Sequence, residues 1–217
     1  MKESILEIAA KYSTEFLVKN GKHFDDLVNG LLGEIGKAVK ADRAYLFTLH
    51  GLEDGVPYAR HRFEWCADGI KPQIDNAILR TIPLLPKYEE LFEKLCNGEH
   101  WCLYDATGDE VLKEQDILSM CLIPIRMPHN LWGFIGFDQC THYREWGKSE
   151  KNALQISANI IGAARAKNAR MTQLEETTEI LSRLESGIRG SQGKAVRDID
   201  DMRRILSTMQ GGHDGGV

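Results

Sequence analysis

A glycine-punctuated aromatic segment near residue 135 constrains the fold of this chain more than any other feature. The segment reads Leu-Trp-Gly-Phe-Ile-Gly-Phe-Asp over residues 131–138, and a short polar connection after it ends at Trp146. A long run without proline then begins at about Glu150. This order predicts that a sheet ends here and passes directly into a long helix.

Two amphipathic helices and a hairpin are predicted ahead of that segment. Apolar residues three or four apart predict a helix from Ser4 to Val18, which Asn20 and Gly21 end, and a second helix over about residues 24–39. Residues 43–50 and 58–66 are rich in aromatic and apolar side chains and predict two paired strands.

The second of these strands is predicted to have two unlike faces. Successive side chains of a strand point to opposite sides of the sheet. With strict alternation, one face carries Arg60, Arg62 and Glu64, and the other carries His61, Phe63 and Trp65. We therefore expect one polar face and one largely apolar face.

The middle of the chain is predicted to be less regular than its flanks. Residues 67–86 hold three prolines and no sustained period, which indicates a crossing loop. A short helix over 87–97, a strand over 101–104, a helical turn over 108–115 and strands over 117–125 and 131–138 follow. This order predicts a mixed α+β fold with an antiparallel sheet.

After Trp146 a helical stripe continues beyond the usual length of a globular helix. Seven-residue spacing within it is typical of a two-stranded coiled coil, although Thr178 and Glu185 at alternate core positions would weaken the pairing. The predicted dimer-interface residues are Met171, Leu174, Leu181, Leu184 and Ile188. The alternative is that the stripe packs against its own domain.

These patterns divide the chain into four parts. We expect an amphipathic helix over residues 1–20, a sheet domain over 22–166, a helical extension for signalling and dimerisation over 167–209, and a disordered tail over 210–217.

Four segments in this order resemble the GAF domain family. They cover residues 41–47, residues 63–65 leading to 70–74, residues 122–125, and residues 132–146. The chain is similar to the sensor-type GAF modules of bacterial and archaeal two-component sensors. The resemblance implies a central antiparallel sheet of about five to six strands with N- and C-terminal helices on one face. It also implies a pocket on the other face, covered by a variable segment over residues 67–115.

Large side chains flank that variable segment. Aromatic walls with a few polar groups suit a small-molecule site. The candidate ligand-binding residues are His61, Trp65, Trp101 and Tyr104, and each of them could equally belong to an ordinary core. Members of the family that carry a bilin attach it through a cysteine of the variable segment. No cysteine lies between Thr107 and Ser119, so covalent bilin binding is not expected and the cofactor stays unknown.

The resemblance favours a non-catalytic sensory module that binds a small molecule. The ligand-bound or ligand-free state of the module would be relayed, through the helical extension of a homodimer, to an unidentified signalling protein. No catalytic residue or metal ligand is assigned. One alternative is a dimerisation scaffold without a ligand. Another is an enzyme similar to free methionine sulfoxide reductases, in which Cys102 and Cys121 would supply the attacking and resolving thiols.

Composition argues against several other classes of protein. A formal net charge of -5 does not suit a protein that grips nucleic acid or an anionic membrane. The chain has no apolar run long enough for a signal peptide or a spanning helix, so a cytoplasmic location is expected. Five cysteines without a C-x-x-C pair predict reduced, mostly buried thiols.

Overall fold

The computed structural model of this chain describes residues 4–19, 21–51, 56–128, 130–189 and 202–207. The chain forms two compact units, Met1–Asn168 and Ala169–Val217. The elements in order are α1 (Ile5–Val18), η1 (Gly21–His23), α2 (Phe24–Val39), β1 (Arg43–Gly51), β2 (Pro57–Cys66), η2 (Ala77–Arg80), β3 (Ile82–Pro83), α3 (Glu89–Cys96), β4 (Trp101–Leu103), α4 (Glu110–Lys113), β5 (Ser119–Met127), β6 (Asn130–Gln139) and α5 (Lys148–Arg189).

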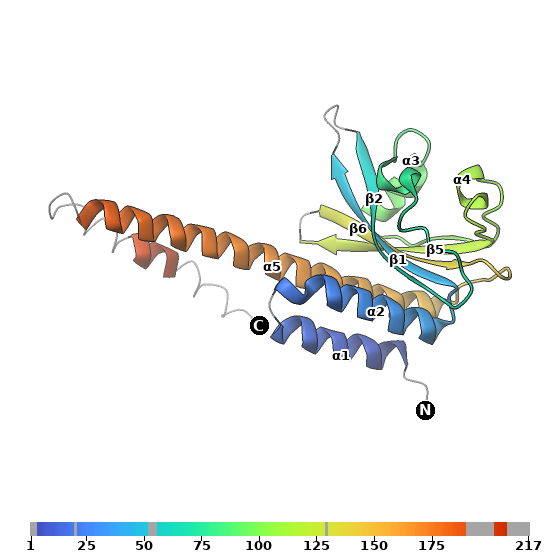
Figure 1. The fold of residues 1–217 in the computed structure, drawn as a ribbon, viewed down its shortest axis with the longest axis horizontal. Coiled ribbons are helices and arrows are strands. Elements are labelled where there is room, and N and C mark those ends of the chain that lie inside the picture. Colours follow the sequence, from blue (N-terminus) through green and yellow to red (C-terminus); the bar gives the residue numbers. More distant parts are fainter. Residues whose placement is uncertain (1–3, 20, 52–55, 129, 190–201, 208–217) are drawn as a thin grey trace. The chain divides into compact units, whose positions relative to one another are not determined.

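A six-stranded antiparallel sheet forms the centre of the first unit, which confirms the predicted fold class. The strand order is β3-β2-β1-β6-β5-β4. The glycine-punctuated strand β6 lies inside the sheet and pairs with both β1 and β5. Helices α1, α2 and the first part of α5 cover one face, and α3 and α4 lie on the other (Figure 1).

The helix-covered face holds the larger apolar core. Ser4 caps α1 in a reciprocal pair with Glu7, because the Glu7 N–H donates to the Ser4 hydroxyl and the Ser4 N–H donates to the Glu7 carboxylate. The apolar stripe of α1 packs on α2, and α2 packs on strands β1 and β2. The buried residues that these helices and α5 contribute include Ile8, Tyr12, Val28, Leu31, Ile35, Leu154, Ala158 and Ile161.

A β-bulge at Arg62 changes which side chains of β2 share a face. Leu46 of β1 is paired with Phe63, but the next residue, Phe47, is paired with His61, so Arg62 is the extra residue. The prediction of strict alternation along residues 58–66 is therefore wrong. His61 lines the cavity on the face opposite the helices, where it stacks on Phe47. Phe63 belongs to the helix-covered core and Trp65 packs against it.

Trp65 packs closely against α2. A Cβ atom added at Gly36 would collide with the Trp65 ring, and one added at Gly33 would lie 3.2 Å from it. Glycine at these positions lets a large ring lie against the helix backbone. This close approach explains two of the glycines that weaken the helix propensity of α2.

The connection from β6 to α5 is held by an arginine and a tryptophan. The Arg144 guanidinium donates to the backbone oxygen of Val39 and forms an ion pair with Glu150 in the first turn of α5. Trp146 is buried and its ring centroid lies 5.9 Å from that of Phe137. Together these contacts fix the start of α5 relative to β6 and α2.

The second unit begins within α5, which continues to Arg189. Met171, Leu174 and Leu184 are about half exposed, Leu181 is partly buried, and the side chain of Ile188 lies outside the described residues. Residues 190–201 and 208–209 of the predicted extension, and the predicted tail at 210–217, also lie outside the described residues. No helix in the described ranges is both long and apolar enough to cross a membrane.

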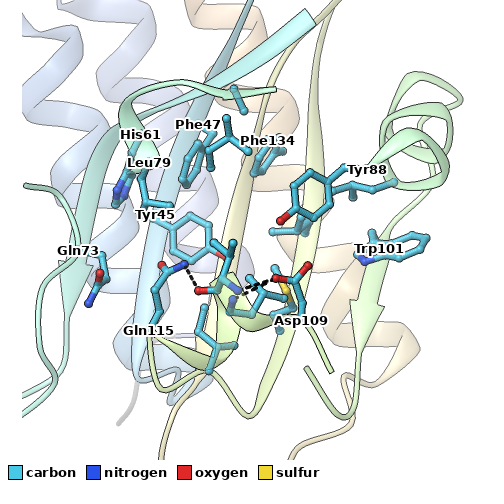
Figure 2. A pocket seen from close by; sticks show the side chains of 18 of the residues that line it. Tyr45, Phe47, His61, Gln73, Leu79, Tyr88, Trp101, Asp109, Gln115 and Phe134 are labelled. Carbon is cyan, nitrogen blue, oxygen red and sulfur yellow. Dashed lines mark hydrogen bonds between the residues drawn. The ribbon is translucent and has the colours of Figure 1, made fainter. Parts of the chain in front are cut away.

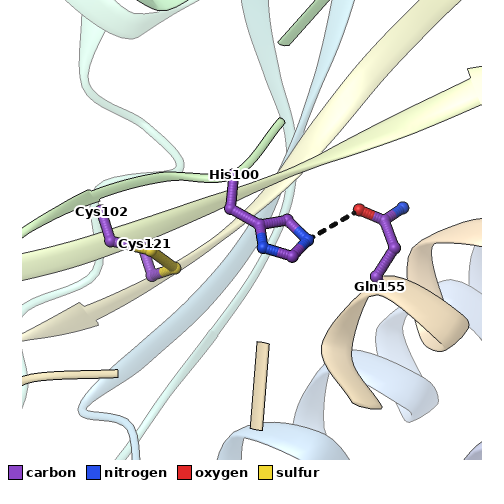
Figure 3. Close-up of a disulfide and its surroundings, with 4 residues drawn as sticks. All are labelled: His100, Cys102, Cys121 and Gln155. Carbon is purple, nitrogen blue, oxygen red and sulfur yellow. Dashed lines mark hydrogen bonds between the residues drawn. A yellow bond between two sulfur atoms is a disulfide. The ribbon is translucent and has the colours of Figure 1, made fainter. Parts of the chain in front are cut away.

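Cys102 and Cys121 form a disulfide between the paired strands β4 and β5 (Figure 3). The expectation of reduced cysteines is therefore wrong for this pair, because cross-strand pairing places the two side chains directly opposite each other. Cys66, Cys96 and Cys140 are free thiols.

Candidate ligand-binding site

A cavity of about 250 Å³ lies between the sheet and the segment that crosses its free face. Strands β1, β2, β4, β5 and β6 provide one side, and residues from η2, α3 and α4 provide the other (Figure 2). The volume corresponds to roughly eight water molecules at the density of the liquid. The cavity is thus large enough for a small organic molecule.

Most of the cavity wall is apolar or aromatic. The aromatic members come from β1, β4, β6 and the residue before α3, and the aliphatic members come mainly from the crossing segment. The wall includes Tyr45, Phe47, Leu79, Ile82, Leu84, Tyr88, Leu91, Trp101, Leu103, Val111, Leu112, Ile117, Met120, Leu122 and Phe134. A wall of this composition binds ligands mainly by removing apolar area from water.

One end of the cavity carries a buried charged cluster. The Arg43 guanidinium donates to Asp138 Oδ2 at 3.1 Å, and its Nε lies 3.4 Å from Glu64 Oε1. Its remaining terminal nitrogen donates to the backbone oxygens of Lys71 and Gln115. Arg43 is therefore ion-paired with both carboxylates, while its Nε is buried without a hydrogen bond.

Asp138 lies directly behind the cavity wall. Its Oδ1 accepts a hydrogen bond from the Tyr45 hydroxyl at 2.8 Å. Burial raises the pKa of Asp138 to about 7, although Arg43 and Tyr45 both act in the opposite direction. Two buried carboxylates share one guanidinium here, so this end of the cavity has no excess of positive charge.

His61 is a wall residue both of whose ring nitrogens are buried without hydrogen bonds. Its side chain is 7% exposed, and neither ring nitrogen has a hydrogen-bond partner in the described part of the chain. Burial lowers the pKa of His61 to about 4. The nearby backbones of Gln73 and Phe63 oppose this effect, but neither forms a hydrogen bond of ordinary geometry with the ring. The ring is therefore neutral at pH 7 and offers one donor and one acceptor.

Polar groups at the mouth of the cavity pair with one another. Lys87 Nζ lies 3.0 Å from Asp109 Oδ2, and the same ammonium lies 4.8 Å from the centroid of the Tyr88 ring. Asp109 also caps α4 by accepting from the backbone of Val111 and Leu112. The side chain of Lys87 is 55% exposed, so this pair borders solvent.

The structure brings two of the four sequence candidates together around the cavity. His61 on β2 and Trp101 on β4 line opposite sides of it (Figure 2). Trp65 lies on the helix-covered face, because the bulge at Arg62 turns it away. Tyr104 is 56% exposed and stacks on Tyr143 with a centroid distance of 5.5 Å, outside the cavity wall.

Sequence reasoning missed the residues at the charged end of the cavity. Arg43 and Glu64 lie in segments that were predicted as strands, where the single informative signal was an ionisable residue among apolar neighbours. That pattern also fits exposed strand residues, so only the fold distinguishes the two cases.

None of the five cysteines lines the cavity, and all five lie in the described part of the chain. Burial raises the pKa of Cys66 to about 11 and that of Cys140 to about 12, so both thiols are protonated at pH 7. Among the described residues, no group of three or more His, Cys, Asp or Glu side chains could hold a metal ion.

Comparison with known proteins agrees with this architecture. The family model of the GAF domain matches residues 23–164. The methanogenesis regulatory histidine kinase FilI of Methanothrix harundinacea is 30% identical over 218 residues, which cover 97% of this chain. The chain spans only 24% of the length of that kinase.

Solved structures of low sequence identity share the fold. The far-red absorbing dark state of JSC1_58120g3 with bound biliverdin IXa has a TM-score of 0.62 at 14% identity, covering 75% of this chain and 99% of that one. The phycoerythrobilin-bound GAF domain from a cyanobacterial phytochrome has a TM-score of 0.60 at 16% identity, covering 76% and 98%.

Proposed function

The chain belongs to the GAF domain family, and we propose that it is a non-catalytic sensory module whose cavity binds a small molecule. In this proposal, occupancy of the cavity is passed through α5 to a signalling partner. The similarity to a regulatory histidine kinase supports a role in signal transduction. The similarity covers about a quarter of the length of that kinase. The signalling partner is therefore proposed here and is not taken from the kinase.

The unpartnered imidazole of His61 carries the proposal of a ligand. A buried polar group without a hydrogen bond costs about 1–3 kcal/mol of stability. His61 lies in the wall of a cavity, where a ligand could supply the missing partner. This arrangement favours the sensor over a scaffold whose pocket is filled by its own side chains.

A chain of contacts leads from the cavity toward α5. Arg43 and Tyr45 hold Asp138 near the end of β6. The following residue, Gln139, accepts a hydrogen bond from Arg144 at 3.3 Å, and Arg144 pairs with Glu150 in the first turn of α5. A ligand that displaces the wall around Tyr45 can therefore change how α5 is held.

The position of the cysteines supports binding rather than thiol catalysis or covalent attachment. A reductase needs a reactive thiol beside its substrate, and a covalently bound bilin needs one beside the chromophore. The cavity wall of this protein contains none. The ligand is therefore proposed to be held without a covalent bond.

Dimerisation through α5 is the second part of the proposal. Met171, Leu174 and Leu184 are each at least 44% exposed on this helix. Large apolar side chains repeated along one helix are commonly covered by a second helix. A homodimer would let the two copies of α5 report a change at either cavity.

Native mass spectrometry of protein purified from its source tests the ligand directly. We expect a reproducible added mass that is released on denaturation. Leu103→Trp should abolish it, because a larger ring on β4 would fill the cavity. Ile156→Trp adds the same ring at an exposed position of α5 and should retain the mass. The binding proposal fails if the wild type carries no added mass, or if Leu103→Trp retains it.

A further inference from the structure

The charges around the cavity restrict the kind of ligand that it can take. Five wall residues carry formal charges, two positive and three negative, and they are Arg43, Lys87, Glu64, Glu90 and Asp109. We propose, building on the binding function above, that the ligand is an uncharged ring compound whose hydrogen-bonding group meets His61.

No cation of the wall is free to neutralise a buried anion. Arg43 is shared between Glu64 and Asp138 and donates to two backbone oxygens as well. Lys87 pairs with Asp109 at the mouth. A carboxylate or phosphate inside the cavity would lose its hydration without gaining an unpaired counter-charge, which is strongly unfavourable.

The neutral state of His61 also disfavours an anionic ligand. An anion would be stabilised by an imidazolium, but the burial of this ring favours its uncharged form. Arg43 contributes further to that preference, since it is the charged group whose field acts on the ring. A neutral imidazole can instead donate one hydrogen bond and accept another.

The shape and chemistry of the remaining wall favour a ring. His61, Phe47 and Phe134 form a row of stacked rings along one side, with centroid distances of 4.6 Å and 5.2 Å between neighbours. Trp101 stands on the opposite side (Figure 2). Aromatic surfaces on two sides of a cavity match a flat apolar body, and the two unsatisfied ring nitrogens of His61 match one polar group on it.

Matched probes can separate charge from shape. Benzamide and benzoate have nearly the same size, but only benzoate is charged at pH 7, and toluene has the ring without a hydrogen-bonding group. We expect the ligand-free full-length chain to bind benzamide at least tenfold more tightly than benzoate, as measured by calorimetry or by chemical-shift titration.

Variants of histidine then test the contact with His61. His61→Phe keeps a ring in the stack but removes both ring nitrogens, and it should weaken benzamide binding about fivefold, the equivalent of one hydrogen bond. Toluene binding should not weaken. His50→Phe alters an exposed histidine outside the cavity and should leave the affinity for all three probes unchanged.

The outcomes distinguish this inference from the binding function beneath it. Benzoate binding in the cavity as tightly as benzamide would overturn the charge preference and leave the binding function standing. If no probe binds, the compound released from source-purified protein decides: an uncharged ring compound supports the inference, and a charged or acyclic one overturns it. The absence of both probe binding and a released compound would overturn the binding function itself.

Discussion

The imidazole of His61 lies parallel to the ring of Phe47, with 4.6 Å between the centroids and 2° between the planes. Phe47 stacks in turn on Phe134, so the histidine is one end of an aromatic row that crosses from β2 to β6. The row orients the ring of His61 but leaves its nitrogens without hydrogen bonds. A polar group held in this way is suited to binding and unfavourable for stability.

We expect His61→Phe to stabilise the ligand-free protein. The substitution keeps an aromatic ring beside Phe47 and removes two buried polar atoms that have no hydrogen-bond partner. The free energy of unfolding in denaturant should rise by about 1 kcal/mol at neutral pH. His50→Phe, at an exposed position, serves as the control and should change it little. A marked loss of stability in His61→Phe would show that the ring nitrogens are satisfied in the folded state.

The same variant should alter the pH dependence of stability. Burial lowers the pKa of His61 from 6.5 to about 4, so the unfolded chain binds a proton between these values that the folded protein does not. The contribution of neutral His61 to the free energy of unfolding is complete above the pKa of the unfolded chain. It is lost as the pH falls toward the pKa of His61 in the folded protein. Between about pH 7.5 and about pH 5, the wild type should lose about 2 kcal/mol more than His61→Phe.

Equal pH dependence in the two proteins would contradict this value of the pKa. The comparison with the variant is necessary because Asp138 changes the stability of the protein with pH in the opposite direction. Its folded pKa is raised by burial, so its contribution is greatest at low pH and declines as pH rises.

Two tryptophans on opposite faces of the sheet should respond differently to truncation. Trp65→Ala removes a ring packed on α2 and should cost on the order of 2–3 kcal/mol, somewhat below the usual cost for a fully buried tryptophan. It should leave ligand affinity intact in protein that remains folded. Trp101→Ala should weaken ligand binding with a smaller loss of stability, since it borders the cavity on an edge strand. Denaturation curves and ligand titrations measure both quantities, and the reverse pattern would contradict the assignment of faces.

Gly162→Ala should loosen the contact between α5 and the sheet. A Cβ atom at this position would collide with the backbone oxygen of Arg126, which cannot move independently of the β5–β6 hairpin. Overpacking of this kind costs about 1–3 kcal/mol. Gly147→Ala is the matched control, because a Cβ atom there would meet nothing within 4 Å. The two variants should therefore differ clearly in thermal denaturation, and equal stability would argue against close packing at Gly162.

Charged substitutions along α5 test the proposed dimer. Leu174→Asp combined with Leu181→Asp would place carboxylates at two positions of the predicted heptad. We expect sedimentation to show dimers of the wild type and monomers of this variant. Thr172→Asp introduces the same charge at an exposed position, seven residues before Glu179 and off the predicted interface, and should remain dimeric. A wild-type mass that stays monomeric at every concentration would contradict dimerisation.

Hydrophobic periodicity was sufficient to predict most elements of this fold. The helices α1 and α2 have regular apolar stripes because one side of each is buried in the larger core. The strands around residues 45 and 120 are nearly continuous apolar runs because both of their faces are buried. The side of the sheet that bears the cavity was not predictable from such patterns. Its cover consists of short helices and irregular segments, whose positions depend on tertiary contacts.

The bulge at Arg62 shows why the site itself was only partly predicted. One extra residue in β2 reverses the faces of every side chain beyond it, so that His61 and Glu64 meet at the cavity while Trp65 does not. Arg62 is an exposed arginine, and nothing in its local sequence distinguishes a bulge from regular alternation. Pairing with β1 decides the register, and that pairing is a property of the whole sheet.

A crystal structure of the chain purified from its source is the most direct test of the central claim that the cavity binds a small molecule. We predict electron density for a bound organic compound between His61 and Trp101, with a polar atom within hydrogen-bond distance of the imidazole. A cavity that holds only water, or that is closed by the side chains of the protein itself, would contradict the claim.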